Sequence, residues 1–381
     1  MRGFLERNAF LVRFASLSLF MGISVGLAKF TTTLYALELG AQGWLLAAMA
    51  GAQSVGIVFT SLPVGFWVER FGPARLFVAG SWAMGVLYVL IPALPHAFFL
   101  LALTALISFL MPLRFVSLNT VFMQALERLG QGRTGWQRGA HMSGMFLLGP
   151  VLAAALIPLL GHAGSYWLIG AMFFATAVLA APVLNHHPQA ATGSAARVPM
   201  LQSVRALWQQ PEVRALAAQE CAVQAAHMYY AFYIVVIAVQ QLGLPALGAG
   251  SLVAVQGASF IAALMVLGPV VGRLGPRATV LGGGTLAVLA LLLLALAQQL
   301  AWLWVGGALL GMGLGLLQIH TLTQFAQVGA RLGRGLVGGL LGGTLGAVLG
   351  LQTVFLLFVP VFATLGWRAY RPAPLAQMIS N

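Results

Sequence analysis

The chain has 381 residues, of which 60% are hydrophobic and 7% are charged, whereas roughly 25% of the residues of soluble domains are charged. This composition excludes an ordinary soluble domain and indicates an integral membrane protein. The net charge of +13 comes from eighteen Arg and one Lys against six Glu. Because the Arg residues separate apolar segments and form no continuous basic face, they indicate membrane topology rather than a nucleic-acid partner.

Apolar runs longer than about 18 residues, enough to cross roughly 30 Å of hydrocarbon, recur along the whole chain. The first follows a basic start that resembles a signal peptide, but it continues past Ser24 without a persuasive cleavage site, so we interpret it as a membrane helix. The single cysteine, Cys221, lies inside an apolar run and can form no internal disulfide. We predict twelve membrane helices, at residues 10–37, 43–64, 76–94, 97–122, 139–160, 165–184, 214–240, 247–271, 278–297, 301–327, 333–349 and 351–367.

A polar stretch rich in Pro, Ala and Ser separates the sixth and seventh predicted helices. We interpret it as a linker. The chain then divides into an N-terminal six-helix bundle at residues 1–185, a cytoplasmic linker at 186–213 and a C-terminal six-helix bundle at 214–381. His186 and His187 are adjacent in this linker, which is more typical of a solvated segment than of a metal site, and we predict no bound metal.

Two tandem halves are indicated by an internal repeat. The segment GFWVERFGPARL at 65–76 recurs as GPVVGRLGPR at 268–277, with equivalent residues 203 positions apart, and the same offset relates Gln53 to Gln256. In both copies a Gly is followed five residues later by Arg-x-Gly-Pro. The matched residues are Gly65, Arg70, Gly72 and Pro73 in the first half and Gly268, Arg273, Gly275 and Pro276 in the second.

Membrane orientation follows from the loops between the predicted helices. Cytoplasmic loops carry an excess of Lys and Arg, and here the Arg residues outside the spans all fall in alternate loops on one side. This partition predicts that both termini and the linker lie in the cytoplasm and that the protein resides in the inner membrane. The one-sided residues are Arg2, Arg7, Arg70, Arg75, Arg128, Arg133, Arg138, Arg197, Arg205, Arg214, Arg273, Arg277, Arg331, Arg334, Arg368 and Arg371.

Twelve helices in two similar halves, with a Gly-x-x-x-acid-Arg-x-Gly segment after the second helix, resemble the major facilitator superfamily. The signature loop of that family has the form G-x-x-x-D-R-x-G-R-R. Gly65, Arg70 and Gly72 match it, Glu69 replaces the Asp, and Arg75 stands one position late. The resemblance implies an all-α fold of two pseudo-symmetric six-helix bundles and a transporter that works by alternating access. It also implies that this gating loop latches the halves on the cytoplasmic side, with the acid facing the N-terminus of the eleventh helix.

Two further patterns of the family are partly present. Arg114 stands where many proton antiporters of the superfamily carry a membrane-embedded Arg, and Gly149-Pro150 looks like the Gly-Pro element of the antiporter motif. Ala153 and Ala154 stand where that motif has two glycines. These patterns favour proton-coupled export, with proton-coupled uptake as the alternative, since uptake needs the same fold and residues.

Ionisable side chains inside a span usually face a cavity, because an ionised group near mid-membrane costs about 2.5–3.5 kcal/mol. Lys29 and Arg114 place cations in the first half with no acid inside a span to neutralise them, which favours an anionic or carboxylate-bearing solute. Arg114 is the stronger candidate, because a guanidinium matches the planar fork of a carboxylate. The predicted solute-binding residues are Arg114, Lys29, Gln53, Asn119, Gln256 and Gln324.

Proton coupling is suggested by polar stripes on two predicted helices of the second half. Glu220, Gln224 and His227 fall at i, i+4 and i+7 and so share one helix face. A carboxylate or an imidazole in low dielectric can change charge near neutral pH, so the stripe fits either a proton carrier or a packed polar contact. His320 begins a similar stripe on the tenth predicted helix and is the third candidate proton site.

A copper importer is the remaining alternative, because thioether, thiolate and imidazole groups suit Cu(I). Met commonly fills gaps in apolar helices, and the two buried cations would repel a metal ion, so this alternative is the weaker one. The sequence shows no phosphate-cradling loop or catalytic acid pair, so we expect no enzyme activity and no cofactor, and a monomer whose partners are lipid, a small solute and protons. The copper candidates are His141, Met142 and Met145 on the fifth span and Cys221, His227 and Met228 on the seventh.

Overall fold

The computed structural model describes residues 9–129, 139–185, 209–297 and 299–332. Within these ranges the chain is helical and contains no strand, which confirms the all-α fold class. Nine helical segments in the described ranges are long and apolar enough to cross a membrane. The last two predicted helices, at 333–349 and 351–367, and most of the predicted linker lie outside the described residues.

The first half follows the predicted spans closely. Long apolar runs form helices in a membrane because no water is present to satisfy the backbone groups, so these groups must bond within the segment. A bend at Gly161, where φ is 67°, divides α7 into the end of the fifth predicted span and the whole of the sixth. The elements are α2 (Ala9–Glu38), α3 (Trp44–Phe71), α4 (Pro73–Leu90), the 3-10 turn η1 (Ile91–Ala93), α5 (Ala97–Leu129), the π-helical segment η3 (Ser143–Leu148) and α7 (Gly149–Asn185).

The second half repeats this order as far as it is described. Pro211 begins its first helix, a position where the missing N–H of proline costs no hydrogen bond. The elements are α9 (Pro211–Val236), the π-helical segment η4 (Ile237–Gln241), α10 (Ala246–Val266), α11 (Gly268–Leu296) and α12 (Leu300–Leu332).

The predicted gating loop at 65–76 is not an extended loop, and this expectation is corrected. Helix α3 continues through Gly65, Glu69 and Arg70 to Phe71, Gly72 alone interrupts the helix, and α4 begins at Pro73. Its repeat behaves alike, because Gly275 interrupts α11 with φ 79° and ψ 167°, against φ 84° and ψ 147° at Gly72. L-residues with a Cβ are strained in this region. The internal repeat therefore encodes one backbone break in each half.

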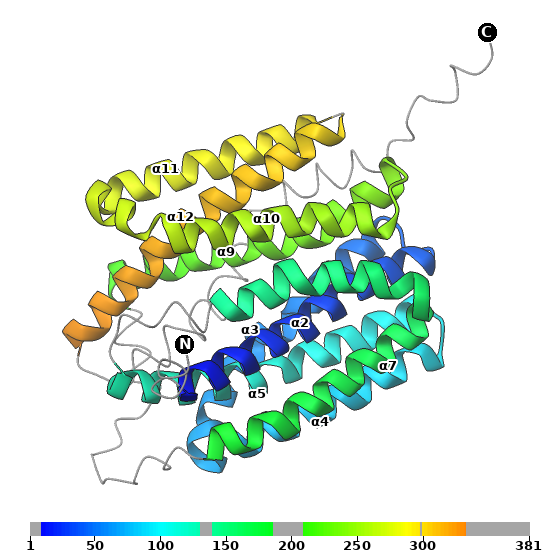
Figure 1. Ribbon diagram of the computed structural model, residues 1–381, viewed down its shortest axis with the longest axis horizontal. Coiled ribbons are helices and arrows are strands. Elements are labelled where there is room, and N and C mark those ends of the chain that lie inside the picture. The colour runs from blue at the N-terminus through cyan, green and yellow to red at the C-terminus, as the bar shows by residue number, and fades with distance from the viewer. Residues whose placement is uncertain (1–8, 130–138, 186–208, 298, 333–381) are drawn as a thin grey trace.

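The helices of the first half pack together, and α9 to α12 form a second group beside them (Figure 1). The halves meet where α10 packs against η3 and α7, and where α9 packs against α2. A Cβ on Gly257 of α10 would lie 2.6 Å from the Phe146 Cβ, and one on Gly250 would lie 3.1 Å from the Ala154 Cβ. Small residues thus allow the halves to approach closely along this seam.

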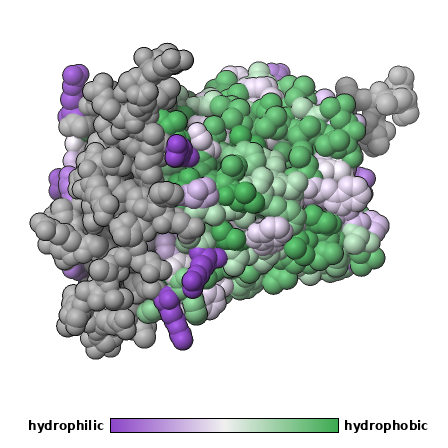
Figure 2. Space-filling model, turned by 60° about the horizontal axis from the view of Figure 1, so that its bottom comes forward, coloured by the Kyte–Doolittle hydropathy of each residue, from purple (hydrophilic) through white to green (hydrophobic). Residues whose placement is uncertain are grey.

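The outer surface matches a lipid environment. The face shown in Figure 2 is largely hydrophobic, and hydrophilic side chains gather mainly toward one end of it. Large exposed apolar side chains include Trp44, Phe59, Leu281 and Val288, which would be costly in water. Arg13 lies near the start of α2, Arg70 in the last turn of α3 and Arg214 near the start of α9, so alternating helices bring these charges to one end of the molecule.

Candidate solute-binding site

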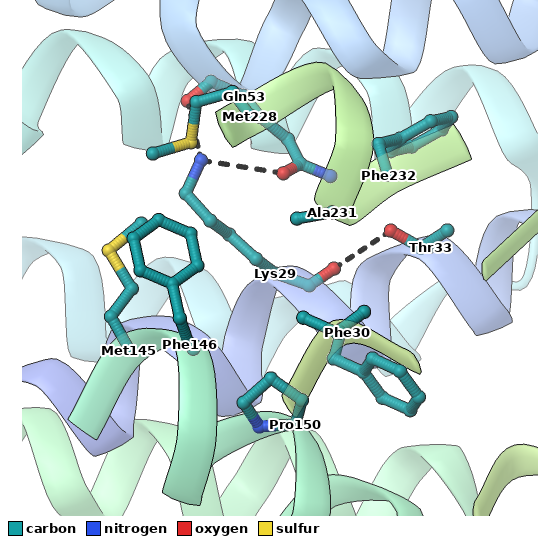
Figure 3. A pocket seen from close by; sticks show the side chains of 12 residues that line it. Lys29, Phe30, Thr33, Gln53, Met145, Phe146, Pro150, Met228, Ala231 and Phe232 are labelled. Carbon is teal, nitrogen blue, oxygen red and sulfur yellow. Dashed lines mark hydrogen bonds between the residues drawn. The ribbon is translucent and has the colours of Figure 1, made fainter. Parts of the chain in front are cut away.

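A pocket lies between the two halves and has Lys29 at its centre (Figure 3). Its wall combines α2 and α3 of the first half, η3 and the start of α7, and α9 and α10 of the second half. Of the described residues that line it, Lys29 alone carries a charge. We call this space the central pocket; its lining residues are Gly26, Lys29, Phe30, Thr33, Gln53, Met145, Phe146, Pro150, Met228, Ala231, Phe232 and Val253.

The ammonium group of Lys29 has weak partners. Its Nζ donates to the backbone carbonyl and to the side-chain Oε1 of Gln53, both at 3.5 Å. These distances lie beyond the 2.7–3.2 Å of ordinary N–H···O bonds. The amide Nε2 of Gln53 is buried and has no hydrogen-bond partner among the described residues. Lys29 and Gln53 together therefore present unused donors, which suit an acceptor on a bound molecule.

The π-helical segment η3 places Met145 and Phe146 in the pocket wall. Pro150 has no N–H, so the Phe146 carbonyl lacks its α-helical donor, and the Gly149 N–H bonds five residues back to Gly144. A Cβ on Gly26 of α2 would collide with the Met145 carbonyl oxygen, and one on Gly149 would lie 2.7 Å from the Gly26 Cα. Close backbone contact between α2 and η3 thus sets the position of this wall relative to Lys29.

Lys29 also borders a second space inside the first half, which we call the N-bundle chamber. It lies among α2, α3, α4 and α5 and has room for a water molecule. The Thr104 Oγ1 is buried and, like the Gln53 Nε2, lacks a hydrogen-bond partner among the described residues. The chamber is lined by Ala28, Lys29, Thr32, Gln53, Tyr88, Thr104, Ile107, Ser108 and Met111.

Glu220 is buried in the second half and is held by amides from two helices. The Gln224 Nε2 donates to its Oε1 at 2.9 Å, and the Gln318 Nε2 of α12 donates to its Oε2 at 2.7 Å. The predicted stripe on α9 therefore joins α12 at this carboxylate. His227, its third member, belongs to a different contact.

His227 lies where the two halves meet. Its ring stacks on Phe146 of η3 with centroids 4.8 Å apart and meets the edge of Phe260 at 4.3 Å. The Gln256 Nε2 and the His227 Nδ1 are 2.8 Å apart. Both His227 and Gln256 are buried, and neither lines the central pocket. Gln256, which was predicted to bind solute, instead holds this histidine.

The other predicted polar residues lie apart from Lys29. His320 is 3.2 Å from the Gln219 Nε2, and that amide also donates to Thr321 at 3.0 Å. Asn119 on α5 and Gln324 on α12 line neither the central pocket nor the N-bundle chamber. His141, a copper candidate, has its Nδ1 3.2 Å from the Ser18 carbonyl.

Comparison with known proteins identifies the fold. A sequence profile described as Major Facilitator Superfamily matches residues 9–335. The chain belongs to this superfamily. A crystal structure of a mutant of the nucleoside transporter NupG has a TM-score of 0.69 and 13% identity, covering 95% of this chain and 100% of that chain. A second NupG crystal structure has a TM-score of 0.66 and 13% identity, covering 94% and 98%.

None of the curated proteins compared with this chain matches it. At 13% identity the NupG structures show the shared fold alone. Membership of the superfamily makes the chain a transporter rather than an enzyme, and a multi-pass membrane protein. It also explains why the halves meet around a pocket, since transporters of repeated construction bind their solutes near the interface between repeats.

The membrane-embedded Arg of this superfamily member does not reach the central pocket. Arg114 is fully buried, with its guanidinium carbon 4.0 Å from the ring centroid of Phe173 and 5.4 Å from that of Phe77. Its three nitrogens have no hydrogen-bond partner among the described residues. Contact with aromatic faces stabilises the charge there. The geometry thus reverses the expected order, and Lys29 becomes the stronger solute-binding candidate.

The predicted gating segment carries two exposed arginines. Arg70 and Arg75 are exposed at the end of α3 and the start of α4, and Arg70 lies over the Phe71 ring at 5.3 Å. The predicted partner, the N-terminus of the eleventh helix, lies outside the described residues. Gly268, Arg273 and Gly275 occupy the equivalent first turns of α11.

Sequence reasoning missed several residues that shape the site. Phe146 was not predicted, although Gly149-Pro150 signalled an irregular helix three residues later. Tyr88, Thr104 and Tyr166 were not predicted either, because isolated polar residues in apolar spans give no sign of which neighbour they face. The run Thr31-Thr32-Thr33 beside Lys29 was the available signal for a polar chamber.

Proposed function

We propose that this protein is a proton-coupled secondary transporter of a small organic anion, which binds at Lys29 between the two halves. One observation carries the proposal: the central pocket has a single charge among its described lining residues, and that ammonium has only long contacts to one neighbour. A cation held in low dielectric favours a bound counter-charge. A carboxylate or a similar anion supplies it.

The remaining wall suits the apolar part of an organic solute. Phe30, Phe146 and Phe232 offer ring faces, and Met145 and Met228 offer polarisable, adaptable side chains. The NupG structures are described as nucleoside transporters, so nucleosides are a neutral solute class to be tested against anions. A charge-dependent site would prefer an aromatic carboxylate over a nucleoside.

For proton coupling we propose Glu220 in the second half. Its carboxylate is 6% exposed and accepts hydrogen bonds from the side-chain amides of Gln224 and Gln318. A side-chain amide can donate to a carboxylate through its N–H groups and, after turning, accept from a carboxylic acid through its oxygen. His227 and His320 are weaker candidates, since one is enclosed by phenylalanine rings and the other lies beside Gln219.

The solute can move in either of two directions, export or uptake. Export is favoured by the likeness of Arg114 and Gly149-Pro150 to antiporter patterns, as the sequence indicates. Uptake is favoured by Lys29 itself. An anion that binds its ammonium group can cross the membrane together with one proton, and this pair carries no net charge. Proteoliposomes with the more acidic solution either inside or outside distinguish export from uptake. The measurement is which direction of the proton gradient drives accumulation of the solute.

The test of the binding site compares Lys29→Gln with Lys29→Arg in the purified full-length protein. Binding of benzoate, other aromatic carboxylates and nucleosides is measured by isothermal titration. We expect Lys29→Gln to weaken anion binding by about 100-fold, since a charge-assisted hydrogen bond contributes about 1.5–3 kcal/mol, and Lys29→Arg to retain part of it. Arg13→Gln, which removes an exposed positive charge from the same helix, is the matched control. Unchanged anion affinity in Lys29→Gln would contradict the proposal.

A further inference from the structure

We propose that the N-bundle chamber binds a small monovalent inorganic anion of halide size, such as chloride, and that this ion is a counter-charge for Lys29. The lining of the chamber comes from α2, α3, α4 and α5, so the site lies within the first half. It requires no organic solute and therefore goes beyond the proposed function.

Two hydroxyl oxygens that line the chamber already accept hydrogen bonds. The Ser108 Oγ accepts from the Gly56 N–H at 2.8 Å. The Thr32 Oγ1 accepts from the Tyr166 hydroxyl at 3.1 Å. Neither oxygen needs a further donor to be satisfied in a buried place.

The lining groups that lack partners are mainly donors. Figure 3 shows the amide oxygen of Gln53 facing the Lys29 ammonium, which leaves the amide Nε2 on the far side. That buried nitrogen and the Thr104 Oγ1 have no hydrogen-bond partner in the described part of the chain, and Thr104 is 7% exposed. Ammonium and amide N–H groups can only donate, and a hydroxyl can donate as well. Three donors thus border one small space.

A donor-lined space beside a cation suits an anion. A water molecule must also donate, whereas an anion accepts from every donor around it. Among the described residues that line the chamber or the central pocket there is no acid, so none of them neutralises Lys29, and a buried charge without a counter-charge is costly. The chamber has room for a water molecule. A chloride ion is only slightly larger, whereas an organic acid is too large.

Helix packing holds the donors in position. The Gly56 N–H bonds the Ser108 Oγ, and a Cβ on Gly56 would collide with the Phe109 backbone nitrogen, so α3 and α5 touch at this point. Gln53 precedes Gly56 by three residues and Thr104 precedes Ser108 by four, so each donor shares a helix face with this contact. Donors fixed before binding reduce the ordering cost that an ion would otherwise meet.

The ion and the proposed solute depend on the same positive charge, and this consequence alone rests on the proposed function. Lys29 lines both the chamber and the central pocket. Two anions beside one ammonium repel each other strongly in a low-dielectric site. Chloride and an organic anion should therefore weaken each other's binding.

Lys29 is the only lysine of the chain, so one isotopic label reports on it alone. Lysine labelled at Cε is incorporated into the full-length protein in lipid nanodiscs. Sodium gluconate, whose anion is too large for the chamber, is then replaced by sodium chloride at constant pH and ionic strength. We expect a saturable shift of the Lys29 NMR signal, and a rise in the thermal midpoint that Lys29→Gln abolishes.

Variants on α5 locate the ion. Thr104→Val keeps the shape of the side chain and removes the hydroxyl, so we expect chloride affinity to fall at least about tenfold, as for loss of a hydrogen bond to a charged group. Thr104→Ser retains the hydroxyl and should retain the affinity. Thr120→Val is the matched control on the same helix, because the Thr120 hydroxyl bonds the Val116 carbonyl, and it should leave the affinity unchanged.

The outcomes separate this site from the proposed solute site. Identical Lys29 signals in chloride and gluconate would overturn the anion site, as would equal chloride affinities in Thr104→Val and Thr120→Val. A response to benzoate without one to chloride would refute the anion site and leave the solute site intact, and the opposite result would refute the solute site alone. Where both bind, equal benzoate affinity in the two salts would overturn the role of the ion as counter-charge.

Discussion

The two halves place equivalent amides against different partners. Gln53 on the second helix of the first half contacts Lys29, whereas Gln256, which is 203 residues later on the second helix of the other half, contacts His227. Lys29 is partly exposed to the central pocket and the N-bundle chamber, while His227 is enclosed by Phe146 and Phe260. One repeated backbone thus supports a charged pocket in one half and a closed aromatic contact in the other.

This difference explains how an interface between similar halves can be asymmetric. Phe146 belongs to the first half but stacks on the histidine of the second, so the Gln256 and His227 pair forms part of the seam between halves. The Gln53 and Lys29 pair stays within the first half and leaves its donors available. The second half therefore supplies the histidine against which η3 of the first half packs.

The seam gives the largest expected effect. Gly257→Ser installs the residue that stands at the equivalent position of the first half, Ser54. A Cβ there would lie 2.6 Å from the Phe146 Cβ and 2.7 Å from its carbonyl oxygen, and overpacking of this kind costs about 1–3 kcal/mol. Thermal unfolding of the purified protein in detergent should show a clear loss of stability.

The reverse exchange is the control for this seam. Ser54→Gly creates no close contact, so we expect only the cost of Gly within a helix, about 0.5–1 kcal/mol. Losses of the same size in the two variants would mean that the halves do not differ in the way that the packing of Phe146 indicates.

The helix breaks at Gly72 and Gly275 give the next largest expected loss of stability. They test whether the two halves are alike at equivalent positions, whereas the seam tests how the halves differ. Gly72→Ala and Gly275→Ala each force a residue with a Cβ into backbone geometry that costs about 1–3 kcal/mol. Space is not limiting at Gly275, where no atom lies within 4 Å of an added Cβ. Thermal midpoints should fall by similar amounts in both variants, and a fall confined to one half would show that the two breaks are not equivalent.

The paired amides, Gln53 and Gln256, are expected to differ in which property they change. Gln256→Ala leaves the buried His227 Nδ1 without its amide, which costs about 1–3 kcal/mol of stability. Gln53→Ala removes only one long side-chain contact and keeps the backbone carbonyl that Lys29 also reaches, so we expect a stability change below about 0.5 kcal/mol and a change in benzoate affinity instead. Thermal unfolding and isothermal titration of both variants check the contrast, which fails if both amides mainly affect stability or both mainly affect binding.

Much of the fold could be predicted from the sequence because hydrophobic length and Arg placement depend only on local composition. The ten spans before residue 333 appear within a few residues of their predicted bounds, except that α3, α11 and α5 extend further. The gating segment was misread as a loop, since Gly and Pro close together usually mark turns and here mark a single break between two helices.

The site could be predicted only as a set of residues. Position along a helix gives the depth of Lys29 or Arg114, but the direction each faces depends on packing with other helices. Arg114 faces Phe77 and Phe173 inside the first half, and no periodicity in its own helix signals that. The stripe of Glu220, Gln224 and His227 divides for the same reason, because Gln318 approaches one end of it and Phe146 the other.

The acids of the two halves give the smallest expected effect. The first half carries Glu38 at its rim, 59% exposed and paired with His162 at 2.6 Å, whereas the second half holds Glu220 inside, 6% exposed. An exposed carboxylate–imidazole pair of this kind contributes about 0–1 kcal/mol even when the imidazole is protonated, because water and salt screen it and two side chains must be ordered to form it. Glu38→Gln should therefore change stability by less than about 0.5 kcal/mol, measured as the thermal midpoint at low and high salt. A larger loss of stability that vanishes at high salt would show that the contact between Glu38 and His162 stabilises the packing of α2 against α7 by more than an exposed pair usually does. The contrast between an exposed acid in the first half and a buried acid in the second would then be wrong.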